Sequence, residues 1–373
     1  SYTGEDVMEL HLHGGRAVIE GVYSALSAQK GFRFAENGEF SKRAVINGRI
    51  DLTEAEGIND LINAETEAQR DQGLNQLEGA LRLQLEKWSN DLKGFGAHIE
   101  AYIDFPDEQI PENVLSDLLQ GVEETNRELK EFVDDDRKGE ILRSGLKVAV
   151  IGPPNVGKSS FVNWLTKRDI AITSEKAGTT RDIVEAHLDL GGYPVTVADT
   201  AGMRESEDTI EQEGIRRARS WSESADLRVL ILDPETAEDA NAFSDLLKSG
   251  DPVLMNKADR ITIVKKKMSA AYSLVSVKTG YGLESILSEL TTIAKKKMGT
   301  QKPTTITQAR HRALLNDCLT ALREAHFGLR NHADLELIAE DFRSAIYCIG
   351  RITGHIDVED LLDVVFKEFC IGK

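Results

Sequence analysis

In the first 145 residues, the spacing of apolar side chains predicts a short irregular region followed by helices. Val7–Leu12 alternates apolar and polar residues as a strand does, and Ala17–Gln29 is expected to form one helix. From about Asp51 to Glu100, apolar residues recur every three or four positions, which is the period of helices packed on one face. A further helix is predicted at Val114–Phe132, after a break that contains prolines.

From Lys147 the pattern changes to short apolar runs that are typical of strands buried in a parallel sheet. These runs are Val148–Ile151, Val195–Ala198, Val229–Leu232 and Val253–Met255. The segments between them are long enough for crossover helices. The region is therefore expected to form a doubly wound α/β domain with a mostly parallel sheet.

Helical spacing returns after a linker-like stretch at Gly299–Thr307. The residues expected to be buried in the helices that follow are Ala313, Leu314, Leu322, Leu335, Ile338, Phe342 and Ile346. Because helices stand on both sides of the α/β region, we expect both flanks to form one all-α domain into which the α/β domain is inserted. The predicted boundaries are 1–45 for a partial N-terminal domain, 46–145 and 301–373 for the helical domain, and 146–300 for the α/β domain.

Composition and charge narrow the class of protein. The chain has 45 Lys and Arg against 63 Asp and Glu, a formal charge of −18, which argues against tight, purely electrostatic binding of nucleic acid by the whole chain but leaves room for a local basic site. Cys318, Cys348 and Cys370 lie far apart and fit no metal-binding spacing. We therefore expect them to be thiols in a reducing compartment.

No apolar run is long enough for a membrane span, so we expect neither a membrane partner nor secretion. The chain starts at Ser1 without a methionine, and we expect further residues to precede it.

A phosphate-binding loop is predicted at Gly152–Ser159, whose sequence GPPNVGKS matches G-x-x-x-x-G-K-[ST] between a strand and a helix-like segment. Lys158 suits the terminal phosphates of a nucleotide and the Ser159 hydroxyl suits Mg²⁺. Pro153 and Pro154 have no backbone N–H, so the amide donors must come from Asn155 onward. The expected contacts are Asn155, Val156, Gly157, Lys158, Ser159 and Ser160. A glycine turn that matches by chance is the alternative, and the strand–loop–helix setting argues against it.

The loops after the later strands indicate that the nucleotide carries guanine. Asp199, Thr200, Ala201 and Gly202 follow one strand, where a carboxylate that holds Mg²⁺ through water and a glycine that contacts the γ-phosphate belong. Asn256, Lys257 and Asp259 follow another. The Asp259 carboxylate can accept two hydrogen bonds from guanine that adenine cannot donate. Ser276, Val277 and Lys278 suit backbone contacts to the guanine carbonyl. Together these loops predict a P-loop GTPase domain that binds GTP.

The residue that orients the attacking water is not evident. Ras-type GTPases place a Gln directly after Asp-x-x-Gly, and this position is Met203, which cannot orient a water. The acidic segment Glu205–Glu213 supplies candidates, although most of its carboxylates fit a solvated helix start. Thr180 fits the Mg²⁺-binding threonine of a switch segment. Arg181 suits an ion-paired loop residue better than a built-in arginine finger.

With these motifs and their helical flanks in view, the chain resembles the MnmE (TrmE) family of tRNA-modification GTPases, mitochondrial relatives included. The resemblance covers essentially the whole chain. It rests on Ser1–Val7, His13–Gly15, Gly38–Phe40, Asp51-Leu52, Ile103–Glu108, Gly178–Asp182 (GTTRD), Asp199–Gly202 and the terminal Phe369–Lys373 (FCIGK).

The resemblance implies a fold and an activity that spacing alone does not show. It implies a GTPase domain inserted into a helical domain and preceded by an α+β domain that binds a tetrahydrofolate derivative, either 5,10-methylene- or 5-formyl-tetrahydrofolate. Family members are homodimers, cytoplasmic in bacteria and mitochondrial in eukaryotes. With an MnmG/GidA-like partner that uses FAD and NADH, they modify C5 of the wobble uridine, position 34, of tRNAs with carboxymethylaminomethyl- or taurinomethyl-type groups. Their GTPase domains dimerise and are activated by K⁺.

The resemblance also assigns roles to individual residues. The K⁺ ligands would be Asn155, Ser174, Lys176 through its carbonyl, and Thr179, while Ser159 and Thr180 would bind Mg²⁺. Ser174, Thr179 and Thr180 would also contact GTP. Glu211 would position the attacking water through a bridging water, in place of the unsuitable Met203.

The folate site would include Glu9, Arg49 and the terminal Lys373, with Cys370 as a chemically active thiol beside the folate. A surface ion pair is the alternative for Glu9 and Arg49, and a small buried apolar group is the alternative for Cys370.

Two other functions fit the nucleotide motifs. A ribosome-assembly or translational switch GTPase could use the same loops, and Met203 fits such switches too. The helical flanks and the C-terminal cysteine argue against it. A nucleotide-dependent dimerisation module, whose hydrolysis is incidental, is the non-enzymatic alternative.

Overall fold

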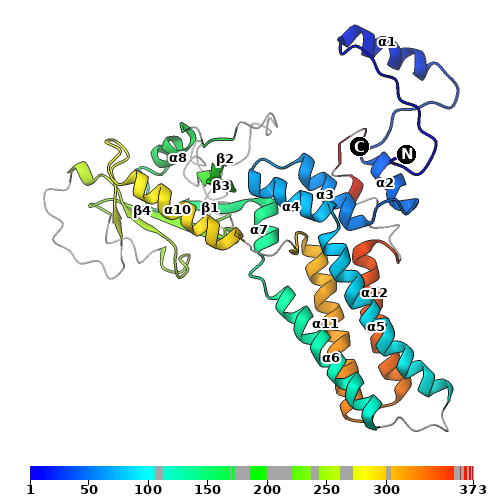
Figure 1. Cartoon of the computed structure of the whole chain (residues 1–373). Helices are drawn as coiled ribbons and strands as arrows, with labels where there is room; N and C mark the ends of the chain where they lie inside the picture. The colour runs from blue at the N-terminus through cyan, green and yellow to red at the C-terminus, as the bar shows by residue number, and fades with distance from the viewer. Residues whose placement is uncertain are drawn as a thin grey trace, which may run out of the picture. The chain divides into compact units, whose positions relative to one another are not determined.

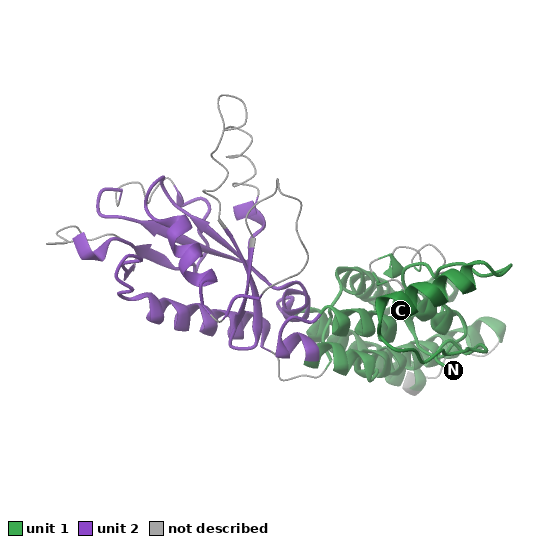
Figure 2. Cartoon of the chain, turned by 90° about the horizontal axis from the view of Figure 1, so that it is seen from above, with its two compact units in different colours: residues 1–63, 71–135, 302–373 green, residues 64–70, 136–301 purple. Residues whose placement is uncertain are grey.

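The structure is a computed structural model of the 373-residue chain. It describes residues 1–105, 112–168, 170–172, 185–199, 221–236, 243–260, 272–299, 304–356, 362, 365–367, 369, 370 and 372. The chain divides into two compact units (Figure 2). The helical unit comprises Ser1–Asn63, Asp71–Asp135 and Lys302–Lys373, and the α/β unit comprises Ala64–Arg70 and Asp136–Gln301.

The α/β unit is built on one six-stranded sheet of order β2-β3-β1-β4-β5-β6. The strands are β1 (Leu146–Ile151), β2 (Glu185–Leu190), β3 (Tyr193–Asp199), β4 (Leu227–Leu232), β5 (Val253–Met255) and β6 (Ser273–Leu274). All neighbouring pairs are parallel except β2 with β3. The predicted doubly wound, mostly parallel sheet is confirmed. The antiparallel edge strand β2 was not predicted.

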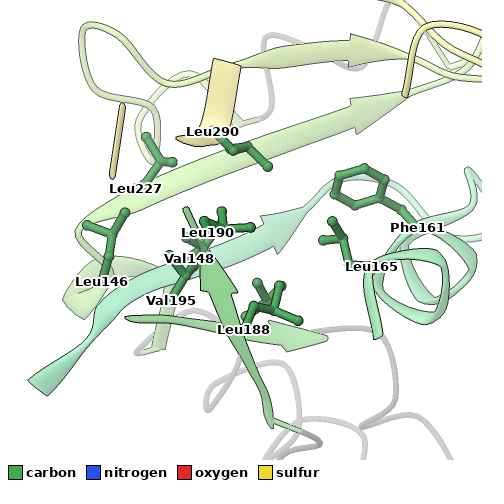
Figure 3. Close-up of a pocket in the computed structure, with 10 residues that line it drawn as sticks. Leu146, Val148, Phe161, Leu165, Leu188, Leu190, Val195, Leu227 and Leu290 are labelled. Carbon is green, nitrogen blue, oxygen red and sulfur yellow. The ribbon is translucent and has the colours of Figure 1, made fainter. Parts of the chain in front are cut away.

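Helices pack on the sheet to form the core of this unit. They include α7 (Lys138–Ser144), α8 (Lys158–Thr166) and α10 (Leu283–Met298). Figure 3 shows Phe161 and Leu165 of α8 and Leu290 of α10 around apolar side chains of the strands. The cavity they enclose, about 10 Å³, is at the lower limit for one water, and its apolar lining gives a water no hydrogen-bond partner. This space belongs to the core rather than to a ligand site.

The helical unit contains helices that precede the α/β region in the sequence and helices that follow it (Figure 1). These helices share one buried core. The helices that begin in residues 1–135 are α1 (Arg16–Ser27), α2 (Glu39–Ile46), α3 (Leu52–Ile62), α4 (Glu67–Leu77), α5 (Ala80–Asp104) and α6 (Glu112–Val133). Two more, α11 (Ala309–Arg330) and α12 (Leu335–Thr353), follow the α/β region. The core joins Trp88 of α5, Val122 of α6, Leu322 of α11 and Phe342 of α12. The α/β region is therefore inserted between two parts of one helical core.

One residue expected to be buried and one predicted strand differ from the structure. Ala313 is exposed, and Leu315, two positions later, is the fully buried residue of this turn. Val7–Leu12 forms no strand: Met8 is 87 % exposed and Leu10 is 53 % exposed. The strand prediction was wrong because alternation alone cannot hold a strand, which also needs a hydrogen-bonded neighbour and a buried face. The helix predicted at Ala17–Gln29 is present as α1.

Asp51, in a motif that carries the family resemblance, has a clear structural role. It caps α3 with a capping box: its Oδ1 accepts from the Glu54 N–H at 2.7 Å, and its own N–H donates to Glu54 Oε2 at 2.9 Å. The Thr53 hydroxyl donates to the same Oδ1 at 2.8 Å. Within the part of the chain that the structure describes, none of the helices is long and apolar enough to cross a membrane.

Candidate nucleotide-binding site

The predicted nucleotide loops meet at one edge of the sheet. Strands β1, β3, β4, β5 and β6 run in the same direction, so their carboxyl ends share an edge. Gly152–Ser159 follows β1, Asp233 follows β4, Asn256–Asp259 follows β5, and Ser276–Lys278 lies just beyond β6. The carboxyl edge of such sheets is where α/β proteins bind their ligands.

The phosphate loop requires glycine at two positions. Gly152 has φ 141°, and a Cβ there would lie 2.1 Å from the Ile231 carbonyl oxygen. Gly157 has φ 104°, and a Cβ there would lie 2.3 Å from Asn256 Nδ2. Asn155 also has a left-handed backbone, with φ 63°. The loop thus turns tightly into the N-terminus of α8, whose amides suit an anion.

Lys158 places its ammonium inside this loop. Its side chain is 6 % exposed, and Nζ donates hydrogen bonds to the carbonyls of Gly152 at 2.9 Å and Pro153 at 2.6 Å. A cation this deeply buried is stabilised by a nearby anion. Ser159 and Ser160 are exposed on the first turn of α8, where a hydroxyl oxygen is a ligand type that Mg²⁺ accepts. The residues present therefore fit a nucleotide phosphate with its Mg²⁺.

Asn256 ties three loops together. It is 4 % exposed, and its Nδ2 donates to the Val156 carbonyl at 2.7 Å, while its Oδ1 accepts from the Val277 N–H at 3.1 Å. Its own N–H donates to the Leu232 carbonyl at the end of β4 at 2.7 Å. One side chain thus fixes the phosphate loop relative to the loop after β6.

Asp259 is held as an ionised acceptor beside this junction. The Ser276 hydroxyl donates to Asp259 Oδ1 at 2.6 Å. This hydrogen bond, with smaller contributions from the charges of Lys278 and Arg260, lowers the pKa of Asp259 below its ordinary value. An exposed carboxylate fixed in this way can accept hydrogen bonds from a guanine base.

Asp233 belongs to the same edge but was not predicted. It is 2 % exposed, its Oδ1 accepts from the N–H groups of Glu235 and Thr236, and its Oδ2 forms an ion pair with Lys257 Nζ at 2.5 Å. Burial acts to raise the pKa of Asp233, but the hydrogen bonds from Lys257 and Thr236 outweigh it and lower the pKa. Its position in the sequence could have indicated this place in the site, because Asp233 directly follows the apolar run Val229–Leu232.

Several predicted residues fall outside the described residues. They are Ser174, Lys176, Thr179, Thr180, Thr200, Ala201, Gly202, Met203, Glu211 and Lys373. Asp199 is the last residue of β3. The K⁺ ligands, Asn155 among them, the Mg²⁺-binding Thr180 and the water-positioning Glu211 therefore stay predictions.

The predicted folate residues lie in the helical unit. Glu9 and Arg49 are both exposed, no hydrogen bond or ion pair joins them, and Glu9 lies 3.6 Å from His11. Cys370 is exposed, so its alternative as a buried apolar group is wrong, and its carbonyl accepts from the Gly38 N–H at 3.2 Å. A role of these residues toward folate stays a prediction.

Comparison with known proteins covers the whole chain. A family model described as "MnmE helical domain" matches residues 52–370, and one described as "GTP-binding protein TrmE N-terminus" matches residues 1–49. The chain is 48 % identical over 373 residues to the tRNA modification GTPase MnmE of Parvibaculum lavamentivorans, covering 100 % of this chain and 84 % of that protein. The same-named protein of Rickettsia bellii is 47 % identical over 381 residues, with the same two coverages.

A solved structure also aligns with part of the chain. The G domain of the FeoB iron transporter of T. maritima aligns with 40 % of this chain and 98 % of its own, at 24 % identity and a TM-score of 0.31. Such a low score supports no argument about function.

Proposed function

Because the chain belongs to the family of the tRNA modification GTPase MnmE, we propose that it hydrolyses GTP to GDP and phosphate in the course of tRNA modification. The observation that carries the proposal is the junction at the carboxyl edge of the sheet. There Asn256 joins the phosphate loop to the loop that holds Asp259 through Ser276. Phosphate-binding and guanine-reading groups thus share one rigid framework.

The residues of the nucleotide site that the structure describes have the following roles in this proposal. Lys158 and the amides from Asn155 onward bind the phosphates, and the Ser159 hydroxyl holds Mg²⁺, which neutralises phosphate charge when it is bound. Asp259 accepts hydrogen bonds from guanine, and the backbone of Ser276–Lys278 contacts its carbonyl oxygen. Asp233 holds Lys257 beside the guanine-reading loop.

We further propose that K⁺ supports hydrolysis and that Glu211 positions the attacking water. Met203 stands where other GTPases have a water-orienting glutamine, so another group must do this work. Asn155 is the proposed K⁺ ligand among the described residues, at an exposed, left-handed position of the phosphate loop. A cation beside the β- and γ-phosphates would stabilise charge that an arginine finger stabilises elsewhere.

We also propose that the protein forms a homodimer and works with an MnmG-like partner that carries FAD and NADH. A tetrahydrofolate derivative would bind near Glu9, Arg49, Cys370 and Lys373. The proposed product is a C5-modified wobble uridine at position 34. A ribosome-assembly or translational switch is less well supported, because the family match includes the helical flanks as well as the GTP-binding region.

GTP turnover in KCl and in NaCl tests the proposal. We expect hydrolysis of GTP but not of ATP, and faster hydrolysis in KCl. Glu211→Ala should lose activity, while the matched control Glu213→Ala from the same acidic segment should keep it. Equal rates in the two salts would reject the K⁺ role. Normal wobble-uridine modification in a deletion strain would reject the tRNA function.

A further inference from the structure

Helices α6 and α11 of the helical unit are neighbours (Figure 1). A groove lies between them. Its volume is about 560 Å³, and it is lined by Glu123, Asn126, Arg127 and Lys130 of α6 and by Arg323 and His326 of α11. All six belong to the same compact unit. The groove is therefore a feature of one body, and it shares no residue with the nucleotide site.

The groove concentrates positive charge on an acidic protein. Arg127, Lys130 and Arg323 face a single carboxylate, Glu123, whereas the whole chain carries a formal charge of −18. Neither Lys130 nor Arg323 forms an ion pair with another residue in the described ranges. Arg127 lies 3.4 Å from Glu124, but both side chains are more than half exposed, and such surface pairs contribute little. Lys130 and Arg323 are therefore available to bind an anion, and Arg127 is held only by an exposed surface pair.

The helix that contributes Arg323 and His326 to the groove also carries an exposed aromatic ring. Phe327 is 70 % exposed and is adjacent in sequence to the groove residue His326. It is four residues after Arg323 on α11, so the two side chains share one face of the helix. Exposed rings next to basic side chains are a common arrangement in proteins that bind single-stranded nucleic acid, because an unpaired base can stack on the ring.

We propose that this groove binds the phosphodiester backbone of tRNA, with Phe327 as a stacking surface for an unpaired base. The inference rests on the proposed function in tRNA modification. The cations are spread along two helices in an open groove, which suits an extended polyanion better than a single phosphate. Arg and Lys supply the backbone contacts, which position the RNA without reading its sequence.

Binding of an unmodified tRNA transcript to the full chain, measured by fluorescence anisotropy across a series of KCl concentrations, tests the inference. Lys130→Ala and Arg323→Ala should each weaken binding roughly three- to tenfold and reduce the salt slope by about one. Phe327→Ala should weaken binding several-fold and leave the salt slope unchanged. Glu123→Gln should strengthen binding, because it removes the carboxylate that repels phosphate.

Lys93→Ala is the matched control. Lys93 is an exposed lysine of α5 that does not line the groove, and its removal should change neither affinity nor slope. Circular dichroism of each variant verifies that the helices are intact. The inference is overturned if the groove variants bind tRNA as the unaltered protein does, if that protein binds no tRNA, or if poly-L-glutamate displaces the RNA as well as unlabelled tRNA does.

The two proposals can fail separately. The same variants should hydrolyse GTP at the unaltered rate in the absence of tRNA, since the groove is not part of the nucleotide site. Groove variants that restore full wobble-uridine modification to a deletion strain and bind tRNA normally would reject the groove and leave the proposed function standing. Failure of the unaltered chain to hydrolyse GTP would reject the proposed function and leave the groove measurements valid.

Discussion

The side chain of Asn256 donates a hydrogen bond from Nδ2 to the backbone carbonyl of Val156 at 2.7 Å, a contact between residues one hundred positions apart in the chain. Both residues are buried. Because Asn256 also accepts from Val277, the phosphate loop cannot move without disturbing the loop after β6. The phosphate-binding and base-reading halves of the site are thus mechanically linked.

Asn256→Ala should weaken both folding and nucleotide binding. It leaves the Val156 carbonyl and the Val277 N–H without their partner in a buried setting, at a cost of about 2–4 kcal/mol in all. Asn256→Asp should also be harmful, since it keeps an acceptor for Val277 but places a carboxylate against a carbonyl. Thermal unfolding and the affinity for a fluorescent GDP analogue measure the two effects. Unchanged GDP affinity in both variants would contradict the linkage.

Asp259→Asn should change which base the site prefers. The carboxylate accepts two hydrogen bonds from guanine, whereas an amide presents one donor and one acceptor and so suits xanthine. We expect GTP affinity to fall roughly ten- to hundredfold and XTP affinity to rise. Ser276→Ala removes the hydroxyl that orients Asp259 at 2.6 Å and should have a smaller effect on GTP alone. Competition binding with GTP, XTP and ATP distinguishes these outcomes, and equal losses for all three would contradict base reading by Asp259.

Most elements of both units followed from the sequence because periodicity records which face of an element is buried. The runs at Val148–Ile151 and Val253–Met255 became β1 and β5, and the helix expected at Val114–Phe132 became α6. Strand β2 was missed, although Gly191 and Gly192, with φ of 65° and 90°, supply the glycine pair that a tight hairpin favours.

The missed features of the site share a different cause. Asp233 and Lys257 are 24 residues apart, and periodicity carries no information about which distant side chains pair. The loop positions could be predicted, because each follows a buried strand. The bonds that link one loop to another depend on how neighbouring strands are ordered in the sheet.

The three cysteines should differ sharply in reactivity. Burial raises the pKa of Cys318 to about 12. Burial also raises the pKa of Cys348, which is only half-buried, whereas Cys370 is exposed. The thiolate is the reactive form, so iodoacetamide at pH 8 should label Cys370 first, Cys348 more slowly and Cys318 only after unfolding. Peptide mass spectrometry over time measures the order. Labelling of Cys318 as fast as Cys370 in the folded protein would contradict its burial.

A buried ion-pair network should make the helical unit sensitive to acid. Glu56 Oε1 accepts from Arg310 Nη2 at 2.8 Å, and Glu56 Oε2 lies 2.8 Å from Nε2 of His311, which is fully buried. Burial acts to raise the pKa of Glu56, but the charges and hydrogen bonds of His311 and Arg310 outweigh it, so the folded-state pKa is lowered. The stabilisation is therefore present above the unfolded pKa, about 4.3, and is lost as pH falls through the lower folded-state value.

Glu56→Gln should consequently destabilise the helical unit by about 3 kcal/mol at pH 7, because it leaves the Arg310 guanidinium and the buried His311 without their carboxylate. The difference between the variant and the unaltered protein should shrink as pH falls below the unfolded-state pKa of about 4.3. Hydrogen exchange of the α3 and α11 amides reports this unit separately from the α/β unit. Glu20→Gln, which breaks the exposed pair of Glu20 with Arg16, is the matched control and should cost less than about 0.5 kcal/mol. A Glu56→Gln deficit that grows as pH falls from 5 to 3 would show that Glu56 is not held ionised in the folded protein.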